Sequence, residues 1–159
     1  MRRRPRKPAV AALLAAVLLG AVGYAVVGFA YASTRIASAD RTLNSVISHQ
    51  NSLTKTFNDV NTRFSVLSSS STYNPDQARA AVDQFVAGAE AAGGTVSLDE
   101  ASLGAASKRL QEASWLTFLS RTEIDREAMR IAHARRALDE ASTVAKGYLQ
   151  DGRFWQAFI

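Results

Sequence analysis

The side chains that most often carry enzyme chemistry are few and scattered in this chain. His49 and His133 are the only histidines, and neither has a second histidine at the spacing of a metal site. The adjacent carboxylates at Asp99–Glu100 and Asp139–Glu140 would point about 100° apart on a helix, so neither pair can flank a substrate alone. Asp99–Glu100 also has a structural explanation, because acids in the first turn of a helix offset its dipole. The sequence predicts surface histidines and no catalytic, metal or cofactor-binding residue.

The wider search for catalytic motifs is also negative. The chain has no cysteine, which excludes disulfide frameworks, zinc–thiolate sites and thiol nucleophiles. It also lacks the hydrolase nucleophile elbow, the P-loop and the dinucleotide-binding fingerprint. We therefore expect a protein that is not an enzyme and that uses no cofactor.

The positive charge is concentrated at the N-terminus. The 159 residues carry a net charge of +5 and a pI of about 10.0, which alone would suggest nucleic-acid binding. Beyond the first seven residues, however, the remaining Lys and Arg balance the 14 Asp and Glu. A basic run directly before an apolar run is a topogenic signal, so we expect no nucleic-acid partner. The topogenic residues are Arg2, Arg3, Arg4, Arg6 and Lys7.

Residues 9–32 form an apolar run without a charge. As a helix this run is about 36 Å long, more than the roughly 30 Å of a hydrocarbon core. Because the basic tail (residues 1–8) should stay in the cytoplasm, residues 34–151 and 152–159 should lie outside. The sequence thus predicts a single-pass cell-membrane protein with a signal anchor at 9–32. Signal-peptide cleavage after Ala32 is the alternative, because Ala30-Tyr31-Ala32 fits the small-x-small rule, although the run exceeds the usual signal-peptide core.

Small residues four apart lie within this run. Ala16 and Gly20, and also Gly28 and Ala32, have a spacing that lets another helix approach closely. The alternative is that Gly and Ala are simply common in such segments.

Residues 36–67 carry a heptad pattern. Apolar residues recur at alternating steps of three and four, with Gln50 as the one polar member of the stripe. Such a stripe faces a partner, either a second chain or the core of a bundle. The candidate interaction residues are Leu43, Val46, Leu53, Phe57, Val60, Phe64 and Leu67.

The rest of the chain has helical periodicity and no strand pattern. Asn74 and Pro75 suit the start of a helix that Gly93–Gly94 should end. A third helix should begin at Ser97, and at Ser120 it either kinks or continues into a last helix ending near residue 150. The predicted fold class is all-α: one N-terminal transmembrane helix, then an extracytoplasmic antiparallel bundle of three or four helices with a coiled-coil-like first helix.

The C-terminal segment 152–159 is aromatic. An up-down-up-down path would bring the last helix back toward the membrane. Phe154, Trp155 and Phe158 are therefore candidate membrane-interface residues, because Trp prefers that zone. Packing of these side chains back on the bundle is the alternative.

These features predict a membrane-anchored interaction or scaffolding protein. Its partners would be the lipid bilayer and another envelope protein, or a second copy of the chain. The alternative is a ligand-sensing bundle that acts through a membrane partner, since helical bundles can hold ligands between their helices. The Ala/Arg-rich, Lys-poor composition is typical of a GC-rich bacterial genome.

Overall fold

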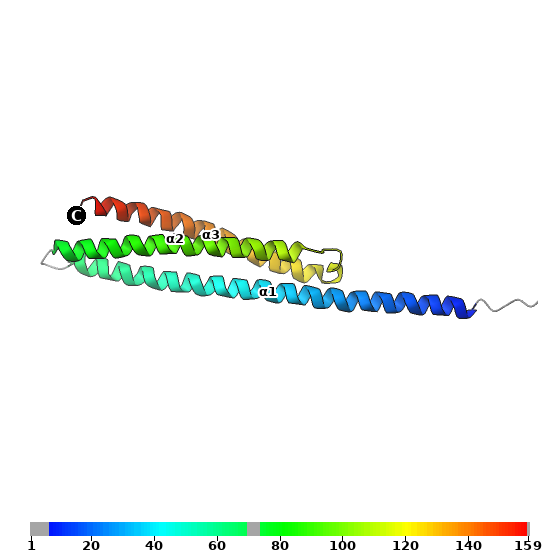
Figure 1. Cartoon of the computed structure of the whole chain (residues 1–159). Coiled ribbons are helices and arrows are strands. Elements are labelled where there is room, and N and C mark those ends of the chain that lie inside the picture. Colours follow the sequence, from blue (N-terminus) through cyan, green and yellow to red (C-terminus); the bar gives the residue numbers. More distant parts are fainter. Residues whose placement is uncertain (1–6, 70–73, 159) are drawn as a thin grey trace, which may run out of the picture.

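Three long helices form an antiparallel bundle. The computed structural model describes residues 7–69 and 74–158, with only the backbone described at 7–13, 60, 61 and 63–69. The elements are α1 (Lys7–Ser69), α2 (Pro75–Gln111), the short 3-10 turn η1 (Phe118–Ser120) and α3 (Arg121–Gln156). No strand occurs within these described ranges. The prediction of an all-α bundle is confirmed, with three helices (Figure 1).

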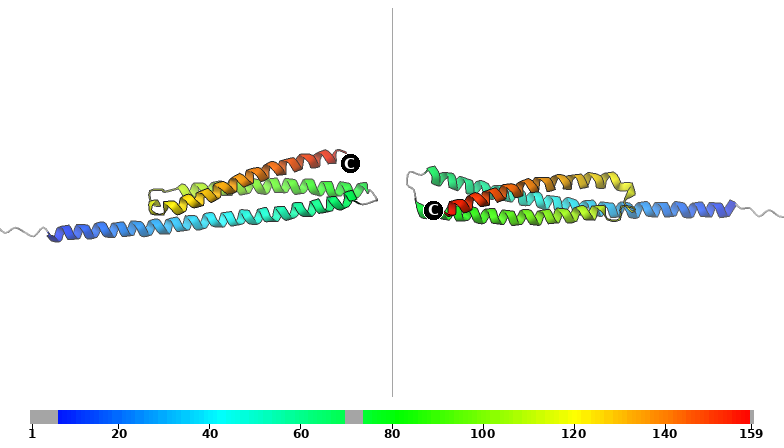
Figure 2. Two further views of the ribbon diagram at one scale, coloured as in Figure 1. Left: turned by 180° about the vertical axis from the view of Figure 1, so that it is seen from behind. Right: turned by 90° about the horizontal axis from the view of Figure 1, so that it is seen from above.

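Helix α1 joins the apolar run and the heptad stripe without a break. Its 63 residues make a rod about 95 Å long. The apolar N-terminal part projects beyond α2 and α3, which lie beside the rest of α1 (Figures 1 and 2). Among the described residues, α1 contains an 18-residue stretch that is apolar enough to cross a membrane, and only 6% of this stretch is buried inside the structure. This part of α1 is therefore unlike the core helix of a soluble bundle.

Helix α2 begins as predicted but does not end as predicted. The Asn74 side chain accepts hydrogen bonds from the backbone N–H groups of Asp76 and Gln77 at 3.0 and 3.2 Å, and Pro75 follows at the first helical position. The predicted end at Gly93–Gly94 is wrong, because α2 continues to Gln111.

The buried face of α2 explains why the glycine pair is tolerated. Buried residues continue at steps of three and four across it, so tertiary packing outweighs a cost of about 1 kcal/mol for each helical glycine. These residues are Val82, Val86, Ala89, Ala92, Val96, Asp99, Leu103, Ala106 and Leu110.

The chain reverses direction between residues 112 and 120. Ala113 adopts a positive φ of 51°, and the Leu116 backbone N–H donates to the Ala113 carbonyl at 2.9 Å. Of the two alternatives at Ser120, a continuous helix is wrong: α3 starts afresh at Arg121, although the Ser120 side chain makes no cap hydrogen bond. The up-down-up-down path is also wrong, because there are three helices, and α3 runs in the same direction as α1 (Figure 1).

The core is built from one apolar face of each helix. Among the described side chains of the α1 stripe, Ala39, Leu43 and Val46 face inward, as the heptad spacing predicts, and belong to one core with residues of α2 and α3. Full burial of a Leu or Ile side chain contributes about 1.5–3 kcal/mol, and Leu103, Leu110, Ile131 and Leu138 are the largest fully buried side chains described. The core cluster is Ala32, Ala39, Leu43, Val46, Val96, Leu103, Ala106, Leu110, Ile124, Ile131 and Leu138.

Candidate functional site

The predicted interaction stripe is largely used inside the molecule. Leu43 and Val46 are each only 4% exposed, and Leu53 packs against the core. Phe57 is half-buried, with its ring centroid 5.4 Å from that of Tyr148. Leu43 and Val46 therefore cannot contact another protein while the bundle is intact. The side chains of Val60, Phe64 and Leu67 lie outside those that the structure describes.

The predicted topogenic residues fall at the edge of the described chain. Arg2, Arg3, Arg4 and Arg6 lie outside the described residues. Lys7 is the first residue of α1, and its backbone alone is described.

The turn between α2 and α3 lies against the apolar part of α1. The Tyr24 hydroxyl donates a hydrogen bond to the Trp115 carbonyl, and the two ring centroids are 6.3 Å apart. One helical turn further on, Gly28 is buried, and a Cβ there would overlap the Leu116 carbonyl oxygen. The segment of the chain that approaches Gly28 is thus this turn and not another helix.

A polar contact between α1 and the end of α2 lies about two helical turns after Gly28 along α1. The Arg35 guanidinium donates to the Glu112 carboxylate at 2.6 Å and to the Arg109 carbonyl at 2.5 Å. It also lies 4.5 Å from the centre of the Tyr31 ring. The hydrogen bond with Glu112 raises the pKa of Arg35 above its ordinary value, so the guanidinium stays charged. The α2 terminus is thereby fixed to α1.

A histidine–carboxylate pair joins α1 to α2 near the middle of the bundle. His49 Nδ1 lies 2.8 Å from Asp99 Oδ1, and the Asp99 side chain is only 5% exposed. Asp99 Oδ2 is buried without a hydrogen-bond partner. The first-turn explanation of Asp99 is wrong, because α2 does not restart at Ser97 and Asp99 lies in its middle. The sequence did not reveal the pair, although a carboxylate on the apolar stripe of α2 was a signal for it.

The pair borders a small polar pocket of about 340 Å³ between α1 and α2. Its hydroxyl, guanidinium, imidazole and carboxylate groups could hydrogen-bond a small polar molecule. The lining residues are Ser38, Arg41, Thr42, Ser45, Val46, His49, Asp99 and Ser102. Within the described part of the chain, no three His, Asp or Glu residues come together as a metal site.

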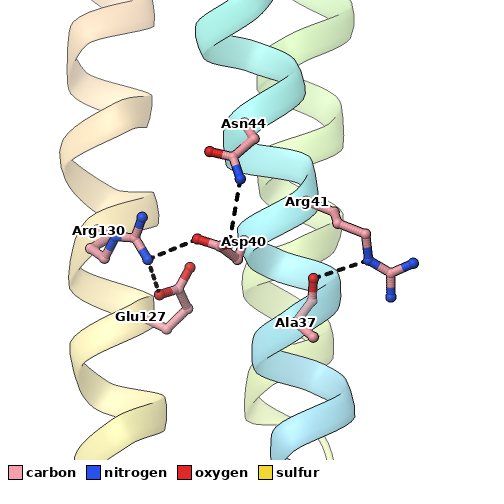
Figure 3. Close-up of polar contacts among 6 residues, drawn as sticks. All are labelled: Ala37, Asp40, Arg41, Asn44, Glu127 and Arg130. Carbon is pink, nitrogen blue, oxygen red and sulfur yellow. Dashed lines mark hydrogen bonds and ion pairs between the residues drawn. The ribbon is translucent and has the colours of Figure 1, made fainter.

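A second buried carboxylate, Glu127, lies beside an ion pair that links α3 to α1. Figure 3 shows the Arg130 guanidinium between two acids, donating to Glu127 at 2.7 Å and to Asp40 at 3.0 Å. Glu127 is only 4% exposed. Its hydrogen bond raises the pKa of Arg130 above the ordinary value. The Arg130–Asp40 pair ties α3 to α1, and Glu127 Oε1 is buried without a hydrogen-bond partner.

The C-terminal aromatic residues lie at the opposite end of the bundle from the apolar part of α1 (Figure 1). Phe154, Trp155 and Phe158 are exposed. The ring centroid of Phe154 lies 5.8 Å from that of Trp155 and 4.6 Å from that of Phe158. Their predicted place at the membrane interface depended on a last helix that returns toward the bilayer. The observed direction of α3 removes that basis.

Two side-chain contacts tie the C-terminal end of α3 to α2. Arg153 pairs with Glu90 at 3.0 Å, and the Gln156 amide donates to Asp83 at 2.7 Å. The exposed aromatic cluster is therefore held on the bundle.

Comparison with known proteins gives no functional lead: no family model matches the chain, and no curated protein or solved structure is significantly similar to it.

Proposed function

We propose that this protein is a membrane-anchored helical interaction or scaffolding protein, with its bundle outside the cytoplasm and its apolar segment retained as the anchor. The observation that carries the proposal is the position of Ala32, which is 1% exposed and belongs to the bundle core. Cleavage after Ala32 would cut α1 inside the bundle and remove the Tyr24 and Gly28 contacts with the turn. Anchor and bundle therefore form one folding unit.

The bundle is elongated, and the apolar part of α1 and the aromatic cluster lie at opposite ends of it (Figure 1). Helix α3 is about 54 Å long. It begins at the turn beside α1, and the aromatic cluster lies at its other end, away from the apolar part of α1 (Figure 1). Exposed aromatic side chains are typical of protein contact sites. The cluster of Phe154, Trp155 and Phe158 is the surface that we assign to another envelope protein or a second copy of the chain.

A cysteine-labelling experiment tests the topology, because the native chain has no cysteine. Ser97→Cys, on the exposed surface of α2, should react with a membrane-impermeant maleimide in intact cells. Pro5→Cys should react only after lysis. Failure of Pro5→Cys to label even in lysed cells would mean that the N-terminal segment has been removed, and would overturn the retained anchor.

A photo-crosslinking residue at Phe158 tests the interaction surface. The matched control is the same residue at Thr143, an exposed position of α3 outside the aromatic cluster. A discrete adduct formed only from position 158 would support the proposal, and mass spectrometry would show whether the partner is a second copy. Equal, diffuse labelling from both positions would contradict it.

A ligand-sensing role is the second candidate, favoured by the polar pocket and the unpartnered Asp99 Oδ2. A thermal-shift screen of small polar metabolites against the full chain would test it. A stabilising compound whose effect disappears in Asp99→Asn would support this role. The absence of any stabilising compound would count against it.

A further inference from the structure

The turn between α2 and α3 exposes more large apolar surface than a water-facing connection should. Trp115, Phe118 and Leu119 are 69%, 66% and 64% exposed. Residues 113–120 contain no charge, in contrast to the exposed faces of the helices that flank them. Connections on soluble bundles are ordinarily polar, and a contiguous exposed apolar patch marks an interaction site.

The register of α1 indicates what covers this patch. The basic tail ends at Lys7, and about 20 helical residues span a hydrocarbon core, so a span that starts at Ala9 ends near Gly28. The turn contacts α1 at Tyr24 and Gly28. Residues 113–119 therefore lie at the level where the apolar core of the bilayer gives way to the headgroups.

We propose that this turn is a second membrane contact, in which Trp115, Phe118 and Leu119 insert into the outer-leaflet interface beside α1. The inference rests on the membrane anchoring proposed above. Trp prefers this zone, and the apolar side chains of the turn are removed from water there.

The charged groups around the turn agree with this depth. Arg35 and Glu112 pair at 2.6 Å, about 10 Å above Gly28 along the helix axis, at headgroup level. On the other side of the turn, Arg121 pairs with Asp125 at 3.6 Å, where an exposed guanidinium could also meet lipid phosphate. Two contacts, the span and the turn, would then hold the bundle at one orientation on the bilayer.

The two tryptophans of the chain provide a test with an internal control. Trp155→Phe leaves Trp115 as the only indole, and Trp115→Phe leaves Trp155, which lies at the far end of the bundle. Each full-length variant is reconstituted into phospholipid vesicles that contain lipid brominated close to the headgroup, and circular dichroism confirms equal helix content. Trp115 should lose most of its emission to the bromine, whereas Trp155 should keep its emission. If bromine quenched both indoles to the same extent, or quenched neither, the inference would be overturned.

A second pair of variants tests the same point without fluorescence. Phe118→Cys and Phe158→Cys replace phenylalanines of similar exposure, 66% and 71%. In vesicles, a water-soluble maleimide should modify position 158 readily and position 118 much more slowly. Similar rates in a protein that resists alkaline extraction would overturn the membrane contact while leaving the anchor intact. Release of the protein by alkaline extraction would overturn the anchor and the turn contact together.

Discussion

The backbone of Leu116 lies directly over Gly28, so the turn between α2 and α3 touches α1 at a position where only glycine fits. This contact joins residues that are far apart in the sequence, and it ties the apolar part of α1 to the bundle. The region on either side of Ala32 is consequently a structural part of the folded domain.

Gly28→Ala should destabilise the bundle. The new Cβ would overlap a backbone carbonyl, which cannot move as a flexible side chain can, and overpacking of this kind costs about 1–3 kcal/mol. Gly20→Ala is the matched control, because nothing lies within 4 Å of a Cβ there. Chemical unfolding of the full chain in detergent, followed by circular dichroism, measures the difference. Equal stability of the two variants would show that the turn does not rest on Gly28.

Ala113→Gly should stabilise the protein. Ala113 has a φ of 51°, a left-handed conformation that costs a residue with a Cβ about 1–2 kcal/mol. Part of that gain is offset by the greater freedom of glycine in the unfolded chain, leaving a net increase of up to about 1 kcal/mol. Ala105→Gly, at an exposed helical position of α2, should instead lose about 1 kcal/mol. Thermal unfolding midpoints that fall in both variants would contradict the left-handed turn.

His49→Ala should lower the free energy of unfolding by about 1–3 kcal/mol, because it leaves a buried Asp99 oxygen without its partner. The control is His133→Ala, at an exposed histidine, which should change stability by less than about 0.5 kcal/mol. In a double-mutant cycle with Asp99→Ala, the combined loss should be smaller than the sum of the single losses. Strict additivity would mean that the two side chains do not interact.

Arg130→Gln should lower the thermal midpoint more than the same change at the exposed Arg126, because buried Glu127 loses its partner. The pairing raises the pKa of Arg130, so its contribution is fully present at pH values below the unfolded pKa and is lost only as the pH rises through the folded one. The difference between Arg130→Gln and the parent should therefore be the same at about pH 7 and about pH 9. A difference that shrinks over this range would contradict the arrangement.

Gly152→Ala should weaken the contact between the end of α3 and α2. A Cβ there would lie 2.6 Å from Val86 Cγ2 and 3.0 Å from Phe85 Cδ1, and the branched Val side chain has little freedom to move. Gly147→Ala, where nothing lies within 4 Å, should instead stabilise α3 by up to about 1 kcal/mol. Hydrogen exchange of the C-terminal turns of α3 would report the change, and faster exchange in both variants would speak against this packing.

The sequence predicted the helices whose signals are local. Asn74 and Pro75 marked the start of α2 because capping acts within a few residues. The heptad spacing of α1 identified its inward face for the same reason, since helical periodicity directly sets which side chains share a side.

The turn and the site could not be predicted, because their signals are not local. The reversal at 112–120 uses Ala113 in a left-handed conformation, where a glycine would have been the expected marker. The glycine pair at 93–94 was misleading because packing of α2 carries the helix through it. The pairing of His49 with Asp99 depends on the register of two helices, which no single-helix pattern encodes.

The intact mass of the protein extracted from cell membranes tests the retained anchor most directly. We expect one species whose mass includes residues 1–32, still attached to the bundle. A shorter species that begins at Ser33 would contradict the membrane anchor, and with it the contact of the turn with the bilayer.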